Sequence, residues 1–222
     1  MEAVQIIFYY FIFQIPINQV SRQLKATEKA IGKLYSKMRG IVSLYIEDLK
    51  IGRSLGVSTM DDNGNQTIGI VEIDETLVTH HNGDQMWVFG IFDRRTKELW
   101  CWPVEDRTAE TLIPLIVSSV EPGARIYSDG WASYSSLAQY GFEHQVVLHV
   151  NGFGSGENTT NGIESCWSEL KRLMKHSQGI QVNSNDPIGS LREHVNLGIW
   201  RRSVQHEDAV ESLVSIINTY YA

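Results

Sequence analysis

Cysteine, long apolar runs and excess positive charge are all scarce in this chain of 222 residues. Its two cysteines, Cys101 and Cys166, form neither a CxxC pair nor a metal-ligand spacing. This argues against a disulfide framework and against a zinc module, and it favours a reducing compartment.

The most apolar stretch is AVQIIFYYFIFQIP, residues 3–16. It is shorter than the roughly twenty residues that a membrane-spanning helix needs. A secretory signal has a basic start and a small-residue cleavage site, and neither is obvious here. We therefore expect a buried helix in this stretch.

The net charge of −7 argues at first against a nucleic-acid partner, but the charge is unevenly distributed. Residues 1–50 carry seven Lys and Arg against four Asp and Glu, and the remainder carries twelve against twenty-two. A polyanion such as DNA can therefore still bind locally, at the basic N-terminal part.

Residues 17–39 predict two short helices around a tight turn, with Thr27 as the N-cap of the second. Each helix has an apolar face, and the second also carries basic residues: Lys29, Lys33, Lys37 and Arg39. This is the outline of a helix-turn-helix with a basic recognition helix. An ordinary helical hairpin with a solvated lysine face fits the segment as well.

Residues 52–67 read as a loop or linker, and a pattern of alternating strands and helices follows it. Strands are predicted at 67–78, 86–93, 99–105, 124–130 and 144–150. A helix is predicted at 108–120, with Thr108 as its N-cap, and a short helix at 131–141. Further helices are predicted from residue 161 onward and through the tail from Pro187.

Three antiparallel strands followed by a crossover to further strands give an α/β order, that of an RNase H-like mixed sheet flanked by helices. A small N-terminal all-helical helix-turn-helix module would precede it. The predicted division is a DNA-binding module (1–50), a linker (51–66), a catalytic domain (67–186) and C-terminal helices packed on that domain (187–222).

Three acids fall at meaningful places in this order. Asp74 lies late in the first strand, Asp129 ends the fourth, and Glu164 lies on the helix after the fifth. In an RNase H-like sheet the first and fourth strands are neighbours, so their ends and a crossing helix would bring these carboxylates together. A lone strand-end Asp is more often a turn residue, and a lone helical Glu is more often solvated.

Three carboxylates in one place repel each other, since a like-charge pair at ~4 Å costs on the order of 4 kcal/mol. Proton uptake or cation binding relieves that repulsion. Oxygen ligands favour two Mg²⁺ or Mn²⁺ ions, which suit phosphoryl transfer. Competing acids are Glu72, on the face of Asp74 but deeper in the strand, Glu75, on the opposite face, and Glu169.

The helix NGIESCWSELKR has an apolar stripe at helical spacing: Ile163, Trp167, Leu170 and Met174. This stripe predicts that the helix packs on the sheet. Glu164 and Lys171 lie seven residues apart and therefore share one face beside the stripe.

Several stretches together resemble DDE transposases of the Merlin type and their bacterial insertion-sequence relatives. The matching stretches, spread over about residues 67–202, are VEIDET, WVFGIFDR, DRTAETLIPLI, ARIYSDGWASYSSL, HVNGF, NTTNGIESCWSELKR and LREHVNLGIWRR. The resemblance implies Asp74, Asp129 and Glu164 as metal ligands in an enzyme that cuts and joins DNA. It also favours the helix-turn-helix interpretation.

In this family a lysine often follows the third acid by seven residues, and Lys171 fills that place as a contact to a DNA phosphate. His149 and Asn151 are candidates for touching DNA or the metal-bound phosphate, with a structural role equally open. Trp131 is expected to be a core or lid aromatic rather than a base-stacking residue.

The function expected is a metal-dependent DNA transposase acting on terminal inverted repeats and target DNA. Paired-end cutting implies a homodimer or a larger synaptic complex. The expected location is the nucleus in a eukaryote, or the cytoplasm and nucleoid in a bacterium. Two alternatives stay open: a non-catalytic DNA-binding protein derived from a transposase, and an RNase H-like structure-specific nuclease.

Overall fold

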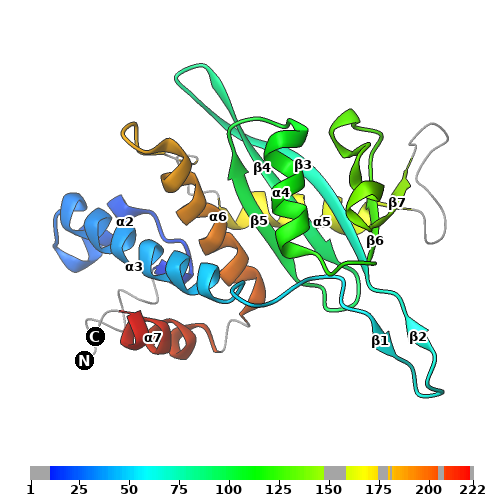
Figure 1. Cartoon of the computed structure of the whole chain (residues 1–222). Coiled ribbons are helices and arrows are strands. Elements are labelled where there is room, and N and C mark those ends of the chain that lie inside the picture. The colour runs from blue at the N-terminus through cyan, green and yellow to red at the C-terminus, as the bar shows by residue number, and fades with distance from the viewer. Residues whose placement is uncertain (1–10, 148–158, 175–179, 181, 205–207, 221–222) are drawn as a thin grey trace. The chain divides into compact units, whose positions relative to one another are not determined.

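A computed structural model describes residues 11–147, 159–174, 180, 182–204 and 208–220 of the chain (Figure 1). These residues form two compact units, one of Lys50–Glu169 and one of Met1–Leu49 with Leu170–Ala222. Most of the helix expected at 3–16, and both His149 and Asn151, lie outside the described residues. No helix in the described ranges is long and apolar enough to cross a membrane.

The unit Lys50–Glu169 is built on a five-stranded mixed sheet in the order β5-β4-β3-β6-β7. Its strands are β3 (Ile70–His81), β4 (Asp84–Asp93), β5 (Leu99–Val104), β6 (Arg125–Ser128) and β7 (Glu143–Val146). β3, β4 and β5 pair antiparallel, whereas β6 and β7 run parallel to β3. The predicted α/β, RNase H-like fold class is therefore confirmed.

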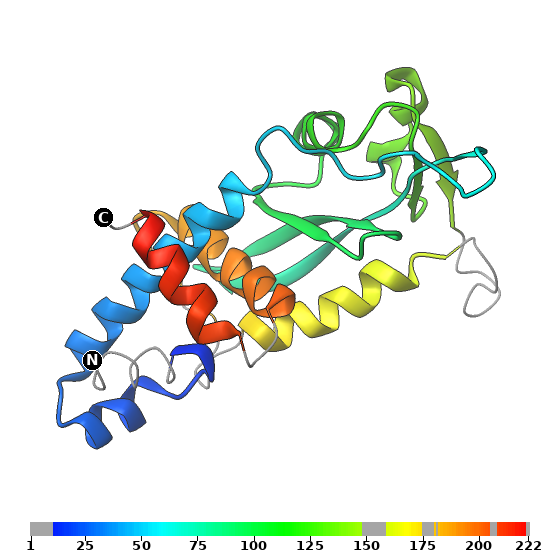
Figure 2. The same ribbon diagram turned by 90° about the horizontal axis from the view of Figure 1, so that it is seen from below.

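The two faces of this sheet are covered differently. Helix α4 (Ala109–Ser119) lies on one face, and the first part of α5 (Asn161–Met174) lies on the other, as Figure 2 shows. Period-two alternation sends Val71 and Ile73 of β3 toward α4, where both are fully buried in the hydrophobic core. The intervening polar residues of β3 therefore face α5.

Two local predictions needed correction. The short helix predicted at 131–141 consists of two 3-10 helices, Ala132–Tyr134 and Leu137–Tyr140. The predicted linker contains a two-stranded hairpin, β1 (Thr59–Met60) with β2 (Gln66–Thr67). Thr108 is the N-cap residue of α4, as predicted, but its hydroxyl donates to Asp106 at 2.7 Å and makes no capping hydrogen bond.

The second unit is helical. Its helices are α2 (Ile17–Leu24), α3 (Glu28–Asp48), α6 (Pro187–Ser203) and α7 (Ala209–Tyr220). Thr27 is the N-cap of α3, as predicted, because its hydroxyl accepts a hydrogen bond from the Ala30 amide at 3.2 Å.

Helix α3 continues beyond the predicted end at residue 39. The apolar spacing continues through Val42 and Ile46, and these residues share one hydrophobic core with Trp200 and Leu213 of α6 and α7. Burial against the C-terminal helices therefore stabilises the helical turns of α3 after residue 39, which the basic pattern of residues 29–39 does not predict.

Candidate active site

Strand pairing brings Asp74 and Asp129 to neighbouring places. In the parallel β3–β6 pair, Ile70 lies opposite Arg125 and Glu72 lies opposite Tyr127. Continued by two residues, this register places Asp129 beside Asp74, just where β6 ends. Both side chains are half-buried. The strand register therefore places Asp74 and Asp129 side by side, as the order of the elements in the sequence predicts.

Glu72 fixes the start of helix α5 on β3. Its side chain is buried, and one carboxylate oxygen accepts the Ile163 amide at 2.8 Å. The other oxygen accepts Arg94 Nε at 2.7 Å, and the same guanidinium donates to the Thr159 carbonyl. A buried carboxylate with these charge-assisted partners holds the helix rigidly. Glu164, one residue after Ile163, is positioned by this clamp.

A tryptophan connects α5 to the first acid. Asp74 pairs across the strands with Gly90 of β4. A Cβ atom at Gly90 would stand 2.9 Å from Trp167 Cζ2, so only glycine leaves room for the indole on this strand. The Trp167 indole N–H donates to Asp74 Oδ2 at 2.8 Å. The indole therefore fixes the orientation of the Asp74 carboxylate.

The acids influence each other's ionisation. The pKa of Asp74 is raised to about 6, mainly by burial, and the charges of Asp129 and Glu164 raise it further, while the Trp167 hydrogen bond opposes the shift. The pKa of Glu75 is raised to about 8 by burial and by the charges of Asp74 and Asp129, and the Arg107 charge opposes that shift. A cation at this place would relieve the repulsion.

The carboxylates have the right donor chemistry for Mg²⁺ or Mn²⁺, but they are not gathered around one point. Glu164 accepts the Thr160 hydroxyl at 2.9 Å, and Asp129 accepts the Trp131 amide at 3.0 Å. Among the residues that the structure describes, no group of three His, Cys, Asp or Glu side chains could hold a metal ion. The three acids therefore fit such a metal ion by their donor chemistry, while the described arrangement does not gather them around it.

The predicted DNA-contacting residues that the structure describes all belong to the helical unit. Lys29, Lys33 and Lys37 are exposed and lie at four-residue spacing along α3. Arg39 forms an ion pair with Glu193 of α6 at 3.2 Å, and burial lowers its pKa. Lys171 is half-buried, two turns after Glu164 on α5.

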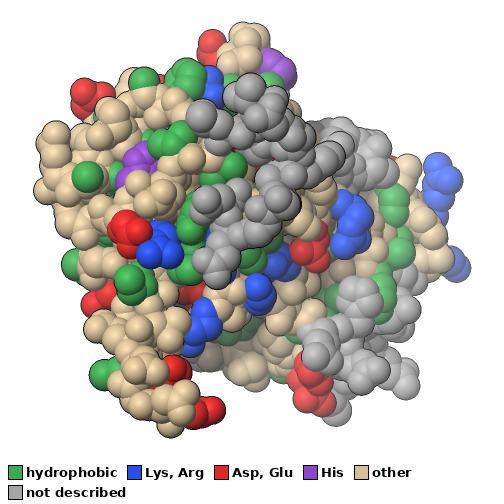
Figure 3. All heavy atoms as spheres, turned by 90° about the vertical axis from the view of Figure 1, so that its right-hand side faces the viewer, with side chains coloured by type: hydrophobic (Ala, Val, Ile, Leu, Met, Phe, Trp, Pro, Cys, Tyr) green, Lys and Arg blue, Asp and Glu red, His purple; other side chains and the backbone are tan. Residues whose placement is uncertain are grey.

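Charges of both signs are interleaved on the surface. On the face that Figure 3 shows, Lys and Arg side chains lie among Asp and Glu side chains within the described part of the chain. The sequence has a net charge of −7, with its basic and acidic residues unevenly distributed along the chain.

The apolar stripe of α5 has two partners rather than one. Trp167 packs on the sheet, as predicted, at Gly90. Leu170 and Met174 lie instead against Gly198 of α6, where an added Cβ would stand 2.7 Å from Leu170 Cδ1. An apolar stripe predicts burial but does not specify which element covers it.

Sequence reasoning missed the roles of Glu72, Trp167 and Gly90 in holding the site together. The sequence pattern indicates only a competing acid at Glu72 and an apolar anchor at Trp167. A glycine inside the strand segment VFGIFD was the available signal, since strand glycines often mark a close approach of another group.

Comparison with known families identifies the class of protein. The profile of the ISXO2-like transposase domain family matches residues 66–181, which is more than half of the chain. The chain therefore belongs to the ISXO2-like transposase domain family. This confirms the resemblance to bacterial insertion-sequence transposases. No curated protein sequence matches the chain.

Retroviral integrases are among the solved structures with similarity to the chain. A simian T-cell lymphotropic virus intasome, solved with the PP2A regulatory subunit B56 gamma, matches at 12% identity and a TM-score of 0.44 over 62% of this chain and 50% of that chain. The HTLV-2 integrase catalytic core domain, solved with magnesium in a dimeric form, matches at 13% identity and a TM-score of 0.40 over 59% of this chain and 83% of that chain. This chain therefore spans only half of the intasome chain.

Proposed function

We propose that this chain is a DDE transposase that cuts DNA at the ends of a mobile element and joins the freed 3′-hydroxyl to target DNA. The observation that supports the proposal is the register of β3 and β6, which places Asp129 beside Asp74. The charges of Asp129 and Glu164 both raise the pKa of Asp74. Membership of a transposase domain family supports this chemistry over an unrelated use of the fold.

Asp74, Asp129 and Glu164 are the proposed ligands of two Mg²⁺ or Mn²⁺ ions. When bound, such ions activate the attacking oxygen and stabilise the leaving oxygen of an in-line phosphoryl transfer. Trp167 favours the charged form of Asp74 and keeps its carboxylate in one orientation. The clamp of Glu72 and Arg94 keeps α5, and therefore Glu164, at the sheet.

DNA contacts are proposed on α5 and on the N-terminal helices. Lys171 would contact a phosphate of the cleaved end as a point charge. The α2–α3 pair is the proposed helix-turn-helix, with Lys29, Lys33 and Lys37 reaching the DNA backbone. Arg39 supports α3 through Glu193 rather than binding DNA, because its guanidinium is already paired and mostly buried.

The proposed functional division is a DNA-reading module in 1–50, a linker in 51–66, a catalytic region in 67–186 and the C-terminal helices in 187–222. DNA ends are cut in pairs in this kind of reaction. We therefore propose that the working form is a homodimer or a larger assembly on DNA.

The direct test is Mg²⁺-dependent strand transfer with a labelled, pre-cleaved DNA end taken from the inverted repeats that flank the coding sequence. The wild type should give joined product, while Glu164→Gln and Asp129→Asn should give none and still bind DNA. Joined product from either variant would refute the site. Nicking without joining would favour a nuclease, and binding without chemistry would favour a DNA-binding protein.

A further inference from the structure

An arginine lies between two tryptophans beside the acid cluster. The Arg107 Cζ atom is 3.9 Å from the ring centroid of Trp87 and 4.6 Å from that of Trp131. Trp87 belongs to β4, Arg107 lies in the segment between β5 and α4, and Trp131 follows Asp129. Three separate parts of the chain therefore meet to hold one guanidinium group.

The main chain around Arg107 is held as firmly as its side chain. The Arg107 carbonyl accepts the Trp131 indole N–H at 3.1 Å and the Ser133 hydroxyl at 2.7 Å. The preceding residue, Asp106, accepts the Thr108 amide at 3.0 Å and the hydroxyls of Thr108 and Thr111 at 2.7 Å. Little conformational entropy remains to be lost when this arginine binds a ligand.

The stack leaves the edge of the guanidinium available for a ligand. The Arg107 Cζ atom lies over both indole rings, and contacts of this kind use the face of the guanidinium rather than its N–H donors, which lie in the plane of the group. Within the residues that the structure describes, no carboxylate lies at ion-pair distance from Arg107. Trp131 is 41% exposed, so of the two expected roles, core or lid aromatic, it does not have the first. The Arg107 guanidinium is therefore a preorganised hydrogen-bond donor for an anion that is not part of the chain.

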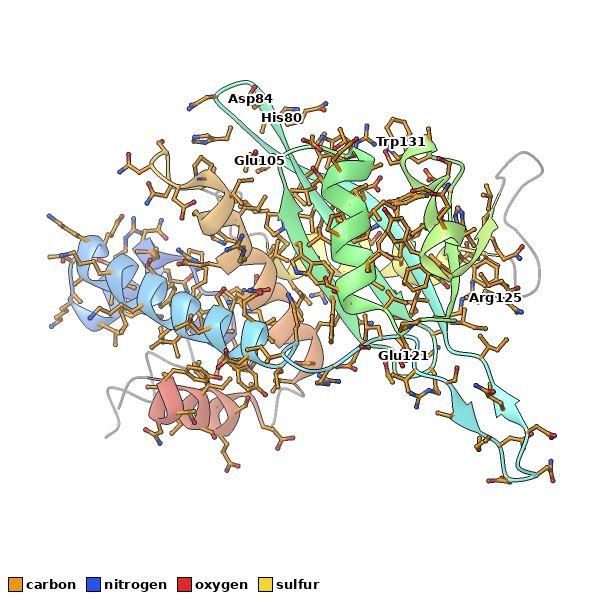
Figure 4. The ribbon with its side chains drawn as sticks, viewed as in Figure 1. His80, Asp84, Glu105, Glu121, Arg125 and Trp131 are labelled. Atoms are coloured by element: carbon orange, nitrogen blue, oxygen red, sulfur yellow. The ribbon has the colours of Figure 1, made fainter. Side chains whose placement is uncertain are left out.

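The stack lies at the end of the sheet where the acids converge. The Trp131 amide donates to Asp129 Oδ1 at 3.0 Å, so the two residues are directly connected. Figure 4 shows Trp131 near the start of α4, while Glu121 lies at the opposite end of that helix. A DNA strand that places a phosphate at Asp129 therefore passes beside this stack.

We propose that Arg107 binds a phosphate of the DNA strand adjacent to the phosphate that reacts, and that Trp87 and Trp131 are positioning residues that hold its guanidinium plane. This assignment rests on the proposed function for the choice of DNA as the ligand. The planar donor pair of arginine matches two phosphate oxygens, whereas a lysine ammonium does not reproduce that geometry.

The test combines a charge-neutral DNA backbone with variants of Arg107. DNA ends are prepared with a single methylphosphonate at successive positions near the cleavage site, which removes one negative charge at a time. At one position the wild type should bind about tenfold more weakly, and Arg107→Ala should show no further loss at that position. Arg107→Ala should also reduce the salt slope of binding by about 1.

Conservative variants separate a contact from a structural role. Arg107→Lys should recover the salt slope but only part of the affinity, because it keeps the charge and loses the planar donor pair. Trp131→Phe should remain close to the wild type, and Trp131→Ala should weaken binding severalfold. Arg95→Ala is the matched control, since Arg95 is exposed in the β4–β5 turn and should leave the affinity unchanged.

The outcomes distinguish this inference from the proposed function. Equal losses for wild type and Arg107→Ala at every methylphosphonate position would overturn the contact, and so would a wild type that does not bind DNA ends. A wild type that shows the position-specific effect but no strand transfer would overturn the transposase proposal and leave the Arg107 contact standing. The wild-type series locates the phosphate without any variant, and the comparison with Arg107→Ala then assigns that phosphate to Arg107.

Discussion

The two faces of strand β3 are used in opposite ways. Val71 and Ile73 point to the α4 face and are completely buried in the core. Glu72 and Asp74 point to the α5 face, where they contact Ile163 and Trp167. The apolar face gives the strand its stability, and the other face can therefore carry acids that weaken the fold.

The two acids of the α5 face also differ from each other. Glu72 is satisfied by Arg94 and by the backbone amide of Ile163, so it serves as a structural clamp. Asp74 has one side-chain hydrogen-bond donor, and its pKa is raised by burial and by neighbouring acids. A buried carboxylate with full partners is structural, whereas an incompletely compensated one is suited to binding a cation.

The largest expected effect is on catalysis. Asp74→Asn should reduce strand transfer by on the order of a thousandfold, because it removes a metal ligand. It should leave the melting temperature unchanged or higher, because it also removes a charge that is destabilised by burial. Strand-transfer assays and thermal unfolding measure the two effects, and a strongly destabilised Asp74→Asn protein would contradict the distinction between Asp74 and Glu72.

The next effect is on stability. Glu72→Ala should lower the free energy of unfolding by about 3–5 kcal/mol, because it leaves Arg94 without its buried partner. Glu98→Ala removes the partner of Arg53 in a more exposed pair and should cost no more than about 1 kcal/mol. Urea unfolding of both variants makes the comparison, and equal losses would show that Glu72 is not a clamp.

A smaller effect concerns the space for the indole. Gly90→Ala should cost about 1–3 kcal/mol through overpacking against Trp167, and it should reduce activity by displacing the donor to Asp74. Gly32→Ala is the matched control, since the added Cβ meets nothing closer than 3.8 Å and should stabilise α3. Unfolding and strand-transfer measurements on both variants are needed. A harmless Gly90→Ala would show that Trp167 has room to move.

The smallest expected effect is on the pH dependence of stability. The folded pKa values of Asp74, about 6, and Glu75, about 8, lie above the ordinary values of 3.8 and 4.5. The folded state therefore holds these protons more tightly, and this stability is fully present below the ordinary values and lost as the pH rises through about 6 and then about 8.

We expect the melting temperature of the metal-free protein to fall by several degrees between pH 5 and pH 8. Added Mg²⁺ should recover more of it at pH 8 than at pH 5, because protons and cations compete for the same carboxylates. The double variant Asp74→Asn with Glu75→Gln should flatten the profile. A profile that stays steep in the double variant would place the titrating groups elsewhere.

Much of the sheet and the placement of its acids could be predicted because they depend on local sequence patterns. Strand β3 is signalled by alternation around Glu72 and Asp74, and β4 and β5 by short apolar runs; the order of elements then determines which strands become neighbours. Asp74 and Asp129 follow from that order. The roles proposed for them and for Glu164 stay predictions that the experiments above address.

What could not be predicted depends on contacts between distant segments. The stack of Trp87, Arg107 and Trp131 joins three segments of the chain, and the local sequence of each segment does not predict its contact with the others. The function of Glu72 depends on where α5 begins against the sheet. The extension of α3 to Asp48 depends on burial against C-terminal helices rather than on its own propensity.

The spacing of Glu72 and Asp74 limits how this gene segment can change in evolution. A substitution in β3 changes one side chain, but the deletion or insertion of a single codon in the strand before Glu72 would exchange the two faces of the strand and move both acids into the core. The strand does contain one irregularity, a register shift between Leu77 and Thr79. It lies beyond Asp74, toward the β3–β4 hairpin end, where a change in length leaves both acids on their face.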